Sequence, residues 1–88
     1  MFYVQAFYND DGFALPLDDA SIPTLAGALR EGFRLIDRVP CAECCIRRNS
    51  PGFVAYLETD WRGELKEAEL YTGRFVTPLN PAGPLFRR

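Results

Sequence analysis

The sequence contains no histidine and two serines, Ser21 and Ser50. Without histidine, a Ser-His-Asp triad, a histidine general base and a histidine-ligated metal are all excluded. Neither serine lies in the pattern that presents a hydrolase nucleophile, and the chain has neither a P-loop nor a glycine fingerprint after a strand. We therefore expect a protein that is not an enzyme.

The chain also has a single lysine, Lys66, and a formal net charge of −2. Direct binding to nucleic acid requires clustered Lys and Arg side chains against the phosphates, so we do not expect it here. No apolar run approaches the length of a transmembrane helix, and we expect no membrane partner. The N-terminal residues lack the basic region of a signal peptide and reach acidic residues by Asp10, so we expect a cytoplasmic protein.

Cysteine is confined to the segment CAECC, as Cys41, Cys44 and Cys45. A redox CxxC motif lies at a helix N-terminus, whereas the residues that follow here lead into a turn. On a strand, Cys41 and Cys45 would lie roughly 13 Å apart, and a disulfide needs α-carbons within about 7 Å. We expect a buried Cys44, exposed Cys41 and Cys45, and no cofactor or metal. A thiol or metal site at residues 41–45, completed by a carboxylate or a second chain, is the alternative.

The composition is that of a soluble folded chain, with 88 residues, 48% hydrophobic and 14% aromatic. This length allows one domain, and the aromatic side chains provide large groups to bury. We expect a single domain at residues 1–76 and a Pro-rich extended tail at residues 77–88. Either Leu85 and Phe86 anchor this tail or its last few residues fray.

Alternation and turn residues predict two N-terminal strands, at residues 2–8 and 13–17, joined by a turn at 9–12. Pro16 indicates that the second strand either lies at an edge or stops early. A helix is predicted at residues 22–37, with Ser21 as N-cap and Gly27 and Gly32 allowing a close approach to a sheet. Its apolar stripe contains Ile22, Leu25, Ala26, Leu29, Phe33 and Ile36.

Turns at residues 49–52 and 62–63 predict three further strands in a meander. With tight turns, Cys44 faces Leu57, Ile46 faces Ala55, Leu57 faces Ala68 and Ala55 faces Leu70, while Arg48 faces Phe53 and Trp61 faces Glu64. This register gathers an apolar face of Ala42, Cys44, Ile46, Phe53, Ala55, Leu57, Ala68 and Leu70. The predicted fold is a single α+β domain, one amphipathic helix on a mostly antiparallel sheet, in the order ββαβββ.

The opposite face of the meander is acidic and contains tyrosine. Glu43, Glu58 and Glu67 align across three strands, with Cys45, Tyr56 and Glu69 in the next row and Val54, Leu65 and Tyr71 nearby. One interpretation is a solvated outer face. The other is a docking site for a protein with a basic surface, with Glu43, Tyr56, Glu58, Glu67, Glu69 and Tyr71 as its binding residues. A calcium site is disfavoured, because a flat row of carboxylates does not supply the six to eight oxygens this ion takes.

These observations favour a small non-catalytic protein-binding module or inhibitor that covers a partner's surface. By analogy of size and charge alone, many phage and mobile-element inhibitors, anti-CRISPR proteins among them, are compact acidic α+β proteins. Besides the thiol or metal site at residues 41–45, a self-assembling subunit is the remaining alternative. Such a homodimer would pack through Tyr56 and Tyr71 or through an unpaired edge strand.

Overall fold

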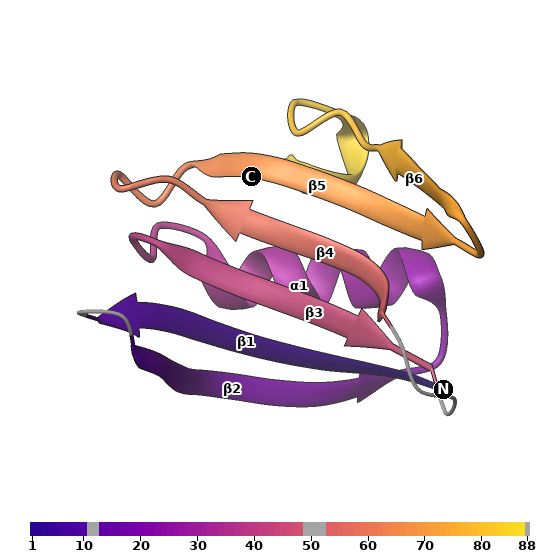
Figure 1. Cartoon of the computed structure of the whole chain (residues 1–88), viewed down its shortest axis with the longest axis horizontal. Helices are drawn as coiled ribbons and strands as arrows, with labels where there is room; N and C mark the ends of the chain where they lie inside the picture. The colour runs from indigo at the N-terminus through magenta and orange to yellow at the C-terminus, as the bar shows by residue number, and fades with distance from the viewer. Residues whose placement is uncertain (11–12, 49–52, 88) are drawn as a thin grey trace.

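The computed structural model of the chain describes residues 1–10, 13–48 and 53–87 (Figure 1). The elements, in order, are β1 (Phe2–Asp10), β2 (Phe13–Ile22), α1 (Leu25–Ile36), β3 (Ala42–Arg47), β4 (Phe53–Thr59), β5 (Leu65–Thr72), β6 (Phe75–Pro78) and the 3-10 helix η1 (Pro84–Phe86). The predicted turn at 49–52 lies outside the described residues, as does the centre of the turn at 9–12.

The strands form a six-stranded sheet in the order β2-β1-β3-β4-β5-β6, and every neighbouring pair is antiparallel. The helix α1 packs on one face of this sheet (Figure 1). The predicted fold class is confirmed, a single α+β domain with one amphipathic helix on an antiparallel sheet. The sheet gains β6, a strand beyond the five that the sequence pattern indicated.

The edge position predicted for the second strand is confirmed, because β2 pairs with β1 alone. Its length was underestimated, since the ladder continues to the pair Phe2–Ile22. A bulge between Ala6 and Phe7 accommodates Pro16, which cannot donate a backbone hydrogen bond.

The helix starts later than predicted because Ser21 and Ile22, expected at its start, remain paired in β2. Thr24, and not Ser21, is the N-cap, and its Oγ1 accepts a hydrogen bond from the Gly27 N–H at 3.1 Å. The helix ends at Ile36, and its buried face consists of Ala28, Leu29, Gly32, Phe33 and Ile36. Ala26, expected on this stripe, is exposed.

The core lies between α1 and the sheet, and the predicted apolar residues of β3, β4 and β5 line it, apart from Phe53, whose side chain lies outside the described part of the structure. Cys44, Ile46, Ala55 and Leu57 are fully buried. Gly32 allows the helix to approach closely, because a Cβ at this position would lie 2.7 Å from Cys44 Sγ. The expectation that Gly32 permits close packing is therefore confirmed.

The predicted register holds through the middle of the meander and fails at its ends. Cys44 faces Leu57 and Leu57 faces Ala68, as expected. At one end a bulge between Ile46 and Arg47 makes Arg47 the partner of Phe53, so the predicted Arg48–Phe53 pair is wrong. Bulges of this kind add one residue to one strand and leave no signal in an alternating pattern.

At the other end, a second bulge between Glu58 and Thr59 pairs Thr59 with Leu65. The ladder stops there, so the predicted Trp61–Glu64 pair is not formed; the Asp60 N–H donates to the Glu64 carbonyl at 2.8 Å. The same bulge turns Leu65 to the core side, where it packs against the hydrophobic cluster. The expectation that Leu65 lies on the outer face is wrong.

Beyond β5, the strand β6 includes Thr77 and Pro78, the first residues of the expected tail. The chain then turns through residues 80–83 into η1, which packs against α1. Phe86 is 5% exposed, and its ring contacts Phe33 edge to face at a centroid distance of 5.7 Å. Across the described ranges, no helix combines the length and the apolar character needed to cross a membrane.

Candidate interaction surface

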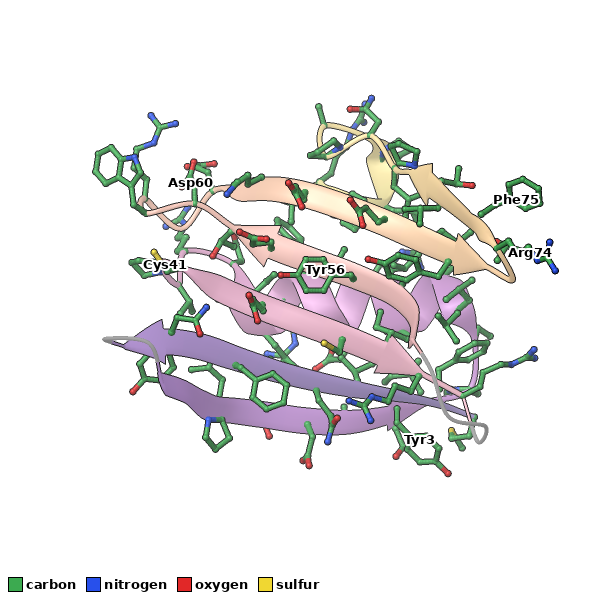
Figure 2. The ribbon with its side chains drawn as sticks, viewed as in Figure 1. Tyr3, Cys41, Tyr56, Asp60, Arg74 and Phe75 are labelled. Carbon is green, nitrogen blue, oxygen red and sulfur yellow. The ribbon has the colours of Figure 1, made fainter. Side chains whose placement is uncertain are left out.

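The sheet face opposite α1, called the open face below, carries the residues predicted to bind a partner. In Figure 1 the helix lies behind the sheet, so the viewer looks onto the open face. Figure 2 shows Tyr56 near the centre of this face, with Tyr3 near β1 and Cys41 and Asp60 toward the end where β3 begins. The open face therefore spans all the central strands without a covering helix in the described part of the chain.

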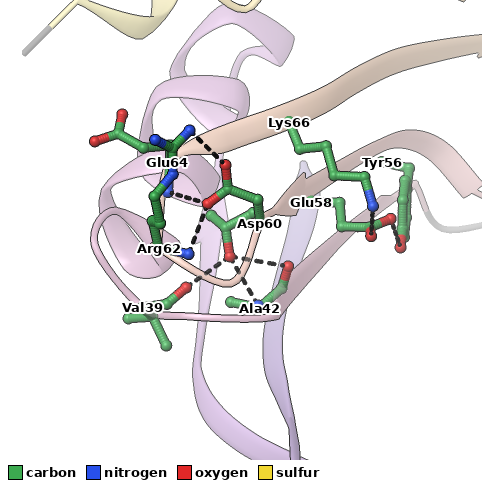
Figure 3. A network of polar contacts seen from close by, with 9 residues as sticks. Val39, Ala42, Tyr56, Glu58, Asp60, Arg62, Glu64 and Lys66 are labelled. Carbon is green, nitrogen blue, oxygen red and sulfur yellow. Dashed lines mark hydrogen bonds and ion pairs between the residues drawn. The ribbon is translucent and has the colours of Figure 1, made fainter.

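Three glutamates cross the open face in one line, called the carboxylate row below. Glu43 of β3 is the direct partner of Glu58 in β4, and Glu58 is the direct partner of Glu67 in β5. Like charges at directly opposite positions destabilise a sheet. Lys66 offsets part of this repulsion, because its Nζ lies 3.1 Å from Glu58 Oε1 (Figure 3). The predicted alignment of the three carboxylates is confirmed.

Two tyrosines of the open face donate hydrogen bonds to carboxylates two residues away. The Tyr56 hydroxyl donates to Glu58 at 3.0 Å, and the Tyr71 hydroxyl donates to Glu69 at 2.7 Å. Burial, together with the carboxylates of Glu58 and Glu43, raises the pKa of Tyr56. The bond to Glu69, reinforced by burial, raises the pKa of Tyr71 to about 12. Both rings are thus held in place, neutral, by anionic neighbours.

Cys45 also points to the open face but is 9% exposed, so the prediction of a surface thiol is wrong. It lies between Gln5 and Tyr56 on the neighbouring strands. A period-2 pattern tells which face a side chain occupies, whereas the size of the flanking side chains decides whether it is covered. Burial raises the pKa of the Cys45 thiol, which makes it a poor nucleophile.

The three cysteines occupy three separate environments. Cys44 is in the core, and burial raises its pKa to about 12. Cys41 is exposed and precedes β3 with a φ of 54°; its N–H donates to the Asp60 carbonyl at 2.9 Å. Within residues 1–10, 13–48 and 53–87, no group of three or more His, Cys, Asp or Glu side chains is placed to hold a metal ion.

A hollow of about 480 Å³ lies at the end of the open face beside the carboxylate row. Trp61, in the turn between β4 and β5, forms part of its wall and is 76% exposed. The hollow is lined by Asn9, Cys41, Glu43, Glu58, Thr59, Asp60, Trp61 and Lys66. Trp, together with Tyr and Arg, is enriched among the interface residues that dominate binding energies. The sequence pattern placed Trp61 in a strand pair and did not indicate this role.

The turn that carries Trp61 is held by hydrogen bonds between backbone N–H groups and the Asp60 side chain (Figure 3). Asp60 Oδ1 accepts from the N–H groups of Arg62 and Glu64, at 2.8 and 3.1 Å. Directly before it, Thr59 is 2% exposed; its hydroxyl accepts from the Ala42 N–H and donates to the Val39 carbonyl. These contacts present Trp61 on a rigid support and not on a loose loop.

The opposite corner of the open face has a different chemistry. A second hollow, of about 470 Å³, is lined by Tyr3, Val4, Gln5, Asp19, Ala20, Ser21, Arg47 and Arg48. Arg47 ends β3 at the far end from Glu43, and Arg48 follows it with its guanidinium over the Phe2 ring, 5.1 Å from the ring centroid. Phe2 belongs to the core cluster, so the open face is polarised between the carboxylate row toward one end of β3 and Arg47 at the other.

The fold and this surface define a small α+β protein with one helix on one sheet face and a polarised, tyrosine-containing opposite face. Comparison of the chain with protein-family models, with curated proteins and with solved structures found no match. The interpretation of the open face therefore depends on its own geometry.

Proposed function

We propose that this protein is a small non-catalytic binding module whose open face docks onto the basic surface of a protein partner. The observation that carries the proposal is the carboxylate row. In the free protein, Glu43, Glu58 and Glu67 repel one another across adjacent strands. Lys and Arg side chains of a partner would attract all three carboxylates. The electrostatic energy of the carboxylate row is therefore most favourable when such a partner covers it.

The residues around the carboxylate row suit such an interface. Tyr56 and Tyr71 offer rigid aromatic area, because their hydroxyl groups are already bonded to Glu58 and Glu69. Trp61 stands exposed at the rim. Arg47 at the opposite corner disfavours basic groups there, which gives the partner one preferred orientation. The module would act by covering the partner's surface, as an inhibitor does.

Charge reversal at Glu67 tests the proposal through two effects of opposite sign. Glu67→Lys places a cation opposite Glu58, which should stabilise the free protein by about 0.2–1 kcal/mol. The same change should weaken capture of basic partners about tenfold or more, because it replaces attraction with repulsion. Thermal unfolding measures the first effect. Affinity capture from lysate at low and moderate salt, followed by mass spectrometry, measures the second.

Asp18→Lys is the matched control, since Asp18 is exposed and pairs with the core-facing residue Ala6 and therefore lies on the α1 side of the sheet. This variant makes the same charge change and should retain the partners that Glu67→Lys loses. Recovery of the same set of proteins by wild type, Glu67→Lys and Asp18→Lys would show that the open face is not the docking surface.

A further inference from the structure

The two edges of the sheet differ in how well they are protected against pairing with another strand. The β2 edge contains Pro16, Asp18 and Asp19, and a bulge interrupts its ladder with β1. Proline, charge and bulges are the devices that block edge-to-edge association. The β6 edge is short and ends at Pro78, but Phe75–Pro78 contains no charged residue and no bulge, and Phe75 and Val76 are 74% and 53% exposed. Before Pro78 this edge is therefore the less protected template for a further strand.

The alternation of hydrogen bonds along β6 shows which of its backbone groups bond to β5 and which face outward at this edge. The Leu79 N–H donates to the Ala68 carbonyl at 2.7 Å, in line with the pairs Thr77–Leu70 and Phe75–Thr72. Since hydrogen-bonded pairs alternate along an antiparallel ladder, Phe75 and Thr77 direct their backbone groups toward β5. Val76 and Pro78 direct theirs away from the sheet.

We propose that β6 pairs antiparallel with β6 of a second copy of this chain, about a two-fold axis at Val76. Val76 of each copy then exchanges both backbone hydrogen bonds with Val76 of the other. Pro78, which has no N–H, directs its carbonyl toward Arg74 of the second copy, the turn residue that directly precedes β6. On the α1 side, Phe75 of one copy packs beside Thr77 of the other, which covers its exposed ring.

Charge favours a second copy as the occupant of this edge. In the two-fold arrangement the two Arg74 residues are four positions apart along the ladder, roughly 13 Å, so their repulsion is screened. Each Arg74 instead lies opposite Pro78 of the other copy, whose neighbour in β5 is Glu69. Two strand spacings amount to about 10 Å between α-carbons, which an extended Arg side chain bridges. By symmetry, the dimer contains this Arg74–Glu69 attraction twice.

The affinity of this dimer should be low, because the pairing strand has four residues. Such a contact buries less than the roughly 800 Å² per partner of a standard stable interface. We expect the mass measured by sedimentation to rise from 10.0 kDa toward twice that value. The mass should rise as the protein concentration increases from about 10 μM to about 1 mM, the range in which a weak complex forms.

Val76→Lys tests the edge, because it places two ammonium groups side by side on the two-fold axis. It should raise the dissociation constant at least about tenfold. Ser21→Lys is the matched control, an exposed residue of the β2 edge, and should associate like the wild type. A mass of 10.0 kDa for the wild type at every concentration would overturn the proposal, as would equal association of the two variants.

A charge exchange tests the same pairing without a change in the edge strand's apolar residues. Arg74→Glu should weaken association severalfold, because it faces Glu69 of the second copy. The double variant Arg74→Glu/Glu69→Arg should restore the wild-type constant. If the double variant associates no better than Arg74→Glu alone, the register about Val76 is wrong. Circular dichroism melting of each variant confirms that the fold is intact.

Discussion

Single side chains on the open face have ionisation behaviour that depends on the fold. Tyr56 and Tyr71 each donate to a glutamate two residues along the same strand. The acceptor in each case is an anion, so loss of the phenolic proton would bring two negative charges together. This is the physical reason that the pKa of each tyrosine is raised.

These hydrogen bonds predict a loss of stability at high pH. Tyrosine in the unfolded chain ionises near pH 10, and the pKa of folded Tyr71 is about 12. A raised folded pKa means that the stabilisation is complete below about pH 10 and is lost as the pH rises toward 12. Urea unfolding between these values should show the decline, and Tyr71→Phe should reduce it. An undiminished decline in Tyr71→Phe would contradict the assignment.

At the scale of elements, the position of α1 depends on a glycine at its buried face. A Cβ at Gly32 would lie 2.7 Å from Cys44 Sγ and 3.2 Å from a Leu57 methyl group. The helix backbone therefore rests directly on β3 and β4. A glycine within a helix costs intrinsic stability relative to alanine, so close packing must more than offset this cost.

Gly32→Ala should destabilise the protein by about 1–3 kcal/mol, because overpacking outweighs the better helix propensity of alanine. Cys44→Ala removes the sulfur atom that the new methyl group would meet. In a double-mutant cycle, the two changes together should therefore cost less than the sum of their separate costs. Chemical denaturation of the four proteins measures this coupling, and strictly additive costs would show that the sulfur does not limit the approach of α1.

At the scale of the whole molecule, the C-terminal segment closes the core at the α1 side. Phe86 packs edge to face on Phe33 and joins the buried cluster. The chain thereby covers the β5 side of the helix with residues distant in sequence from it. Within the described residues the open face stays uncovered as a result, because β6 and η1 both continue on or behind the sheet (Figure 1).

Phe86→Ala should lower the free energy of unfolding by about 3 kcal/mol, the lower end of the cost of deleting a buried phenylalanine ring. Phe75→Ala provides the matched control, because that ring is 74% exposed, and it should change stability by no more than about 0.5 kcal/mol. Equal effects of the two substitutions would show that Phe86 does not contribute to the core. Guanidinium unfolding at low protein concentration separates these effects from association.

The sequence by itself determined the fold class, the buried positions Leu29, Phe33 and Ile36 of the helix, and the register at the centre of the meander. Alternation has a period of two, and a slip of one residue would send Cys44 and Leu57 to water, so the apolar pattern admits one register. The carboxylate row follows from that register, which explains why Glu43, Glu58 and Glu67 could be aligned in advance.

Only the tertiary structure decided the positions of the bulges, the burial of Cys45, the exposure of Trp61 and the packing of Phe86 against Phe33. Bulges at Glu58 and Arg47 insert residues that periodicity does not register. Burial of Cys45 depends on side chains from two neighbouring strands, and burial of Phe86 depends on a contact with Phe33 across 53 positions (86 − 33) of the chain. Local pattern reports which way a residue points, whereas the contacts that cover it come from residues far away in sequence.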